Sequence, residues 1–505
     1  MLLEPYAVYS DAFDARFGCL TDIMAQVLGT APSAFHTYSI WPLLVESYAS
    51  LLGSDRNERN IPLNLRRLTG VVSSLVAQCA YCSALACGLG DVFNGAISVT
   101  KPLKLSGTDL SQADRKAIRM IVAATKVPAR VTPEMQVEVQ KGFGGKAGLQ
   151  QLANILAAGG FTNTLNALLA CELDESFMKK AEVAFKGSLF SFGPHKFLNR
   201  IKPFPAIGPK KPTRNPFRYI LDAIHLYNEW TKVLKITDSF QSHIPTTHPA
   251  LNQWLENMFG FQPRYLAQIH SIEIKRVYCS MLSKIIFWTD QDDDIASGTF
   301  DGVYRPEFPF TDRLIVCYVY FMGASNHLLA LHFAYLAIVK YNVQPWELDM
   351  ALIAARDFNH KEPKSMNDTL EIMVALAYYS SRRYHKRMWR LTPRLLVVTE
   401  NPATVMAFVS LSSVLTMLHR YSAMVDDGLG SEVEVAEFQL SEGVEIGLDI
   451  LEGVCNSKDF DASAEELEIE WDDVDLDTIN VAAASLRGTI RQFTAGQVWG
   501  GGVEY

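Results

Sequence analysis

The sequence predicts an all-α protein built from two tandem copies of one helical module. Apolar residues recur at helical spacing along most of the chain, with two main interruptions at residues 188–216 and 290–310. Sustained alternation of apolar and polar residues is nearly absent, and Asn-Gly, a frequent hairpin turn, occurs only at Asn94-Gly95. A chain of 505 residues is also too long for one ordinary core, so we expect two or three domains.

The first half shows a series of helix signals. Residues 15–53 hold two apolar stretches, and residues 64–88 form a longer one. Ser111 and Asp114 have the spacing of a capping box, which predicts a helix start at that point. Thr132 followed by Pro133 predicts an N-cap and a first helical position. After a glycine-rich turn at residues 142–145, residues 144–173 are expected to form another helix pair.

Proline and charge divide the rest of the chain. Residues 188–216 are rich in proline and basic residues, which predicts a linker between the halves or an ordered arm on a neighbouring domain. Helical periodicity resumes at Tyr219, and an acidic stretch at residues 290–310 reads as an exposed loop. Nine acids in 17 residues, from Asp461 to Asp477, predict a solvated tail. The expected units are residues 1–187, 188–216, 217–430 and 431–505.

Composition excludes several classes of function. The chain is 49% hydrophobic and 20% charged, as globular proteins are, and its net charge of -9 does not favour nucleic acid. The N-terminal residues lack the basic and apolar pattern of a signal peptide. The nearest approach to a membrane span, residues 395–418, is interrupted by Glu400, Asn401 and Pro402. We therefore expect no nucleic-acid or membrane partner. The sparse cysteines favour a reducing compartment, and we expect a cytoplasmic protein.

An internal repeat relates the two halves. Residues 65–68 (LRRL) align with residues 311–314 (TDRL), and both segments continue as apolar helical runs of equal length. The two copies therefore predict equivalent helices in equivalent places. This register sets Cys79 opposite Ser325, Tyr81 opposite His327, Cys82 opposite Leu328 and Ala86 opposite His332.

The cluster Cys79, Cys82 and Cys87 stands out among eight otherwise scattered cysteines. Two cysteines three residues apart on a helix share one face, where one thiolate can attack a peroxide or disulfide and the other can resolve the product. A zinc site would need two further ligands, and neither a second Cys-x-x-Cys nor a histidine pair is evident, so we expect no metal and no cofactor. Two inert cysteines in a helical core are the other alternative.

The residues around this pair resemble the alkylhydroperoxidase-D-like (AhpD-like) and carboxymuconolactone decarboxylase superfamily. Its redox members carry a glutamate, then Cys-x-Tyr-Cys, then a histidine four residues on. The resemblance covers about residues 15–175 and 245–425 and implies a thiol-based peroxidase in an all-α fold. It rests on residues 65–86, 110–114, 131–134 and 161–165 in the first half and 332–337 and 341–348 in the second.

The chain departs from the family pattern at both relay positions. Arg67 stands at the glutamate position and Ala86 at the histidine position, and alanine cannot transfer a proton. Three hypotheses follow. Arg67 or another cation stabilises the thiolate; or His332 or His327 from the second half completes a site shared by the halves; or the fold has lost redox chemistry. In the last case it acts as a decarboxylase-like lyase or isomerase, or as a silent ligand sensor.

The sequence thus predicts a thiol-redox enzyme with Cys79 and Cys82 as catalytic residues and Arg67, His332 and His327 as supporting candidates. Tyr81 and Cys87 are the expected ligand-binding neighbours. His327 and His332 are five residues apart, or about 140° around a helix, so a shared metal is not expected. The expected partners are a hydroperoxide or small organic metabolite and a thiol reductant protein, and a homodimer is consistent with the ring assemblies of the family.

Overall fold

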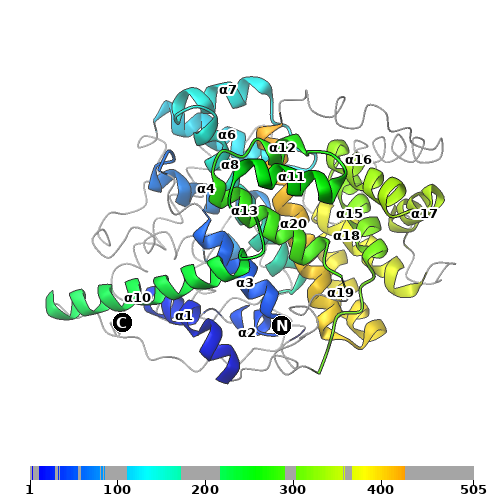
Figure 1. The fold of residues 1–505 in the computed structure, drawn as a ribbon, viewed down its shortest axis with the longest axis horizontal. Coiled ribbons are helices and arrows are strands. Elements are labelled where there is room, and N and C mark those ends of the chain that lie inside the picture. The colour runs from blue at the N-terminus through cyan, green and yellow to red at the C-terminus, as the bar shows by residue number, and fades with distance from the viewer. Residues whose placement is uncertain are drawn as a thin grey trace.

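The computed structural model describes about two thirds of the chain (Figure 1), and every regular element in that part is a helix, which confirms the all-α prediction. Residues 172–215, 290–302 and 427–505 lie outside it, and with them most of the predicted linker, most of the acidic loop and the predicted tail. The described residues are 3, 11–28, 32, 34–54, 59–79, 81–83, 85, 111–171, 216–289, 303–356, 358 and 367–426.

In the first half, helices α6 and α7 begin at the predicted caps. Ser111 and Asp114 form the full capping box, and the Thr132 side chain accepts from the Met135 amide at 3.4 Å. Gly144 and Gly145 have φ of 78° and 77°, which suits the predicted interhelical turn. The helices are α1 (Asp11–Leu28), α2 (Ala34–Tyr38), α3 (Pro42–Gly53), α4 (Leu63–Val76), α6 (Gln112–Thr125), α7 (Pro133–Gly142) and α8 (Lys146–Leu168).

The second half is helical from Pro216 onward. Two of its helices continue as π-helical turns, η4 after α13 and η5 after α16. The elements are α10 (Pro216–Phe240), α11 (His248–Phe259), α12 (Arg264–Ala267), α13 (Ile272–Met281), η4 (Leu282–Ile286), α15 (Phe310–Gly323), α16 (His327–Tyr335), η5 (Leu336–Lys340), α17 (Pro345–Arg356), α18 (Asp368–Arg382), α19 (His385–Thr399) and α20 (Pro402–Val425).

Two predicted helix boundaries were wrong. The segment 64–88 is not one helix, because α4 ends at Val76 and Gln78 takes a left-handed φ of 54° before helical structure returns at residue 81. The segment 144–173 is one helix rather than two, since α8 runs unbroken to Leu168. Inside α8, Gly159 and Gly160 pack closely against side chains of other helices.

The repeat is visible in the backbone of α4 and α15, with a register that differs by one residue from the predicted one. Both helices are 14 residues long, follow an N-cap proline (Pro62 and Pro309) and have an alanine as the C-cap residue (Ala77 and Ala324). Gln78 and Ser325, the next residues, both have φ of 54°. Cys79 therefore corresponds to Asn326, not to Ser325. The identical residues of the alignment, Arg67 and Arg313, favoured the wrong register because similarity elsewhere is low.

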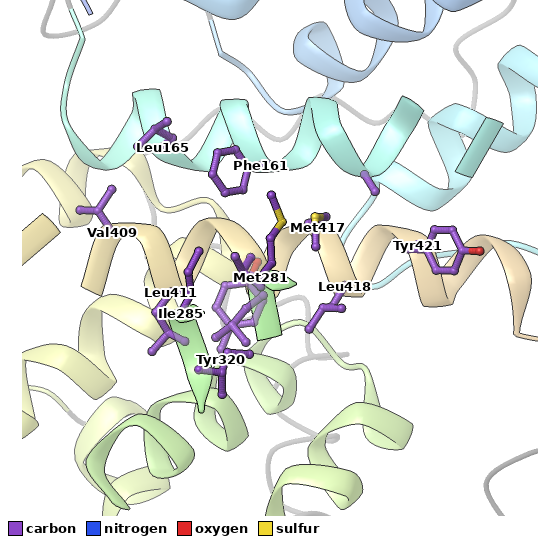
Figure 2. Close-up of a cluster of buried hydrophobic side chains, with 14 of the residues drawn as sticks. Phe161, Leu165, Met281, Ile285, Tyr320, Val409, Leu411, Met417, Leu418 and Tyr421 are labelled. Carbon is purple, nitrogen blue, oxygen red and sulfur yellow. The ribbon is translucent and has the colours of Figure 1, made fainter. Parts of the chain in front are cut away.

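Helices α8 and α20 form the centre of the molecule. Figure 2 shows Phe161 and Leu165 of α8 lying beside the stretch of α20 that carries Val409 and Met417. By length and composition α20 is apolar enough to cross a membrane, and it is the only such helix in the described ranges. All of its most apolar window is buried inside the protein, however, so core packing accounts for its composition.

Contacts between the halves are extensive. Helix α10, which begins at the predicted linker, packs against α1 and α3 of the first half. Residues at the α18–α19 junction also cross over: Arg383 donates to the carbonyl oxygens of Val76 (3.1 Å) and Thr125. The Trp389 indole donates to the carbonyl of Ala167 at 2.9 Å. The predicted domain boundaries remain predictions, but the two halves pack as one unit.

Candidate functional site

Cys79 occupies the N-cap position of the helical residues that follow it, rather than the middle of a helix. The Ser83 amide donates to the Cys79 carbonyl at 2.9 Å, as in a first helical turn. The Cys82 amide donates to the Cys79 sulfur at 3.3 Å, so the sulfur accepts from the amide three residues on, as a serine or threonine cap would. The two cysteines are adjacent because one caps the turn that the other completes.

Helix α8 supplies the surroundings of the Cys82 sulfur. The Asn166 side-chain amide donates to it at 3.3 Å, and the Cys82 thiol lies 3.5 Å from the Thr162 carbonyl. The Tyr38 hydroxyl donates to the Asn166 side-chain oxygen, which fixes the amide with its N–H groups available to sulfur. Both cysteines are almost fully buried, at 6% exposure for Cys79 and 5% for Cys82.

Arg420 brings a buried positive charge from the second half to this site. It is 1% exposed and lies on α20, where its guanidinium donates to the Asn163 side-chain oxygen at 3.1 Å. Its side chain passes over Gly160 of α8, where a Cβ atom would lie 2.8 Å from the Arg420 Cδ. The Asn163 amide also donates to Ser74 at 3.0 Å, so one network joins α4, α8 and α20.

The two thiols are electrostatically different. Burial opposes ionisation of Cys82, but hydrogen bonds from Cys79, Asn163 and Asn166, together with the charge of Arg420, outweigh it and lower the Cys82 pKa. Burial and the interaction with Cys82 raise the pKa of Cys79 well above its usual range. Cys82 is therefore the cysteine that ionises more readily, and Cys79 is the thiol that donates a hydrogen bond to it.

The other residues predicted near the motif are only partly placed. Tyr81 is buried in the core at 2% exposure, which suits a packing role. Arg67 lies on α4, but its side chain is outside the described part of the structure, as is all of Cys87. The cation whose charge lowers the Cys82 pKa is Arg420, on a helix of the other half.

The two predicted histidines lie in different surroundings. His332 is fully buried on α16, with its ring 4.7 Å from Phe261 and 6.0 Å from Tyr265, so it packs within the second half. His327, the first residue of α16, lines a pocket with Val131 and Pro133 of the first half. The second-half residue whose charge acts on the cysteine pair is Arg420, not either predicted histidine.

Arg420, Asn163 and Asn166 were missed as site residues by sequence reasoning. A signal was present, since strongly polar residues inside long apolar helices are rarely buried without a partner. Asn163 and Asn166 are also three apart, which places them on one face of α8. What the sequence did not contain was the pairing of α8 with α20.

One group of side chains has the geometry of metal ligands. Ligand atoms of Asp22, His225 and Glu229 lie within 4.8 Å of one another, and the spacing of His225 and Glu229 on α10 was a signal that sequence reasoning passed over. Glu229 accepts two hydrogen bonds from Lys232, at 2.7 and 2.9 Å. The Lys232 ammonium thus already balances the buried carboxylate.

Comparisons with known proteins leave the site to be interpreted from its own chemistry. No protein-family model, no curated protein and no solved structure matches this chain.

Proposed function

We propose that the chain is a thiol-redox enzyme of the AhpD-like kind, in which Cys79 and Cys82 cycle between dithiol and disulfide. The observation that carries this proposal is the set of donors around the Cys82 sulfur. Asn166 donates to it, Cys79 lies beside it, and the charge of Arg420 favours its ionised form. A cysteine pair kept only for packing needs none of these groups.

In the proposed cycle Cys82 is the nucleophile. Its thiolate attacks the outer oxygen of a hydroperoxide, an S–O bond forms, and the O–O bond breaks. The products are the sulfenic acid of Cys82 and an alkoxide that takes a proton from water. The Cys79 sulfur then attacks the sulfenic sulfur, the hydroxyl leaves as water with the Cys79 proton, and a disulfide forms. An external dithiol reduces it by exchange, and its own sulfurs become a disulfide.

In the redox members of the family a proton relay ionises the cysteine pair. In the proposed enzyme, amide donors and a fixed cation stabilise the Cys82 thiolate instead. Arginine stays protonated at neutral pH, so Arg420 stabilises the anion but does not shuttle protons. Asn163 and Asn166 donate without changing their charge. The proposed enzyme therefore holds its thiolate ready before substrate arrives.

Substitution of each cysteine tests the proposal. Cys82→Ser and Cys79→Ser should each abolish turnover of an organic hydroperoxide with dithiothreitol as the reductant. Cys19→Ser is the matched control: Cys19 has the same 6% exposure as Cys79, and burial raises its pKa to about 11. Unchanged turnover in either variant of the pair, or equal loss in the control, would rule out the paired mechanism.

A further inference from the structure

A second polar site lies at the junction of α7, α16 and α20. It is a pocket of about 340 Å³, within the range of small-molecule sites. Both halves line it, and the Gln136 amide joins them by donating to the carbonyl oxygens of Met424 and Asp426, at 3.1 and 2.7 Å. The polar lining residues on which the argument depends are Asn326, His327, His419, Ser422 and Asp426.

This pocket occupies the place in the second half that the cysteine site occupies in the first. Asn326 corresponds to Cys79, and like Cys79 it caps a helix: its side-chain oxygen accepts from the Leu329 amide at 3.2 Å. Counted from the N-caps of α8 and α20, His419 corresponds to Asn163 and Ser422 to Asn166. Both halves therefore hold a polar site at the equivalent place. In the second half the Asn326 amide stands in place of the Cys79 sulfur, and the His419 imidazole in place of Asn163.

The hydrogen bonds of Asn326 determine the protonation of His419. Since the Asn326 oxygen accepts a backbone N–H, its nitrogen is the atom that lies 3.1 Å from His419 Nδ1 and 2.9 Å from the Ser422 oxygen. His419 Nδ1 is then an acceptor, so the proton of the neutral ring sits on Nε2. His419 is 3% exposed, and its Nε2 has no hydrogen-bond partner in the described structure. A buried N–H donor without a partner calls for an acceptor, and His419 is one of the residues that line the pocket.

The charges around the ring favour an anion. Burial and the positive charges of Arg383 and Arg420 lower the pKa of His419 to about 3, which keeps the ring neutral. Within the described ranges neither guanidinium forms an ion pair with a carboxylate, although the charge of Arg420 also acts on Cys82. The N-terminus of α16, a nine-residue helix, also opens at the pocket and adds partial positive charge. Among the described residues that line the pocket Asp426 is the one acid, and its charge opposes negative charge on a ligand, most strongly a second charge.

We propose that this pocket binds a small organic monocarboxylate, with one carboxylate oxygen accepting the hydrogen bond from His419 Nε2. The polar residues Asn326, Ser422 and His327 line the space beside it. The site is separate from the cysteine pair, and the inference does not depend on redox activity.

Calorimetric titration of the full-length chain tests the inference. The probes are acetate, butyrate and benzoate, with butyramide as an uncharged match for butyrate. We expect at least one carboxylate to bind saturably and butyramide to bind at least about tenfold more weakly than butyrate, since a hydrogen bond to a charged group contributes about 1.5–3 kcal/mol. The chain with both Cys79→Ser and Cys82→Ser should bind the same probes equally.

Variants in the pocket assign the binding. Ala423→Phe, at a half-buried lining position, should fill the space and abolish binding, while Ala423→Ser keeps it. His419→Phe should weaken binding about tenfold or more, and His419→Gln, which retains an N–H donor, should weaken it less. If His419→Phe does not fold, the comparison of Ala423→Phe with Ala423→Ser still tests the proposal. No saturable binding of any carboxylate, equal binding of butyramide, or full binding by Ala423→Phe would overturn the proposal.

Discussion

Cys82 lies in the core, yet its pKa is below that of a free thiol, and the reason is the chemistry of its neighbours. Burial alone raises thiol pKa values, as it does for Cys279, whose pKa rises to about 12. Around Cys82 the donors of Asn163 and Asn166 and the charge of Arg420 outweigh burial and lower the pKa of the thiol. Position and partner, rather than depth of burial, separate a reactive cysteine from an inert one.

We predict that Asn166→Ala raises the pKa of Cys82. One donor to a thiolate contributes about 1.5–3 kcal/mol, or roughly one to two pKa units. The alkylation rate of Cys82, followed by mass spectrometry against pH, should shift to higher pH by that amount. Asn154→Ala is the control, because Asn154 lies on the same helix but donates to Ser54 at 3.0 Å. A Cys82 profile that is the same in both variants would contradict the role given to Asn166.

His419 should make the free energy of unfolding depend on pH. Its pKa is about 3 in the folded protein and about 6.5 when unfolded, so the unfolded state binds the extra proton between these values. Its stabilising contribution is complete above pH 6.5 and is lost as pH falls toward 3. In urea unfolding between pH 4.5 and 6, the His419→Gln variant should show a slope shallower by up to ~1.4 kcal/mol per pH unit.

The difference between the two proteins is the measurement, because other groups titrate in the same range. Burial raises the pKa of Asp312 to about 6, for example, and this contributes a slope of opposite sign in both. Parallel slopes for the parent and the His419→Gln variant would show that His419 is protonated in the folded state.

At the scale of elements, α8 and α20 meet at small residues. Thr164 and Thr416 share a hydrogen bond at 2.7 Å, and Gly160 lies against Arg420. Counted from the two N-caps, Gly160 corresponds to Thr416 and Thr164 to Arg420, so these two contacts exchange under the repeat. The crossing point therefore lies on the axis that relates the two halves.

Gly160→Ala should destabilise the protein, although alanine is the better helix former. An added Cβ would lie 2.8 Å from Arg420 Cδ and 3.2 Å from Thr416 Cγ2, and overpacking of this kind costs about 1–3 kcal/mol. Gly18→Ala on α1 is the matched control, since its Cβ would come no closer than 3.8 Å to another residue and should be neutral or stabilising. Urea unfolding of both variants measures the difference, and equal stability would contradict the close crossing.

At the scale of the whole molecule, the two halves complete each other. Arg383 of the second half binds carbonyl oxygens at the ends of α4 and α6, and Gln136 of the first half binds the end of α20. The His385 ring adds a contact of 3.2 Å to the Ala77 carbonyl, next to the cysteine turn. Helix ends that would face water in an isolated half are therefore covered by the other half.

We predict that α8 and α20 open together. Their shared interface buries apolar residues from both halves, so neither helix can be exposed without disrupting the other core. Native-state hydrogen exchange should find the slowest amides of α8 and α20 exchanging at equal free energy, while those of α17 and the outer end of α10 exchange faster. Faster exchange of α8 with α6 and α7, apart from α20, would indicate two independent domains.

The local features of the fold were predictable from sequence. The all-α class, the capping box at Ser111, the Thr132 cap and the turn at Gly144 follow from residues close together in the chain, whose hydrogen bonds are local. Helix boundaries were predicted less well. The left-handed residue Gln78 carries no glycine signal, and the glycines inside α8 are explained by close packing against other helices rather than by a helix end.

The sequence by itself determined that the chain is helical, that α4 and α15 share one pattern, and that Cys79 and Cys82 are neighbours, since each depends on spacing along the chain. Only the tertiary structure decided that the charge of Arg420 acts on Cys82 and that His419 lines the second pocket. Arg420 lies 338 positions after Cys82, and the sequence alone predicted Arg67, His327 and His332 as its partners instead. Long-range pairing depends on how whole helix faces pack, and many pairings satisfy the same apolar pattern.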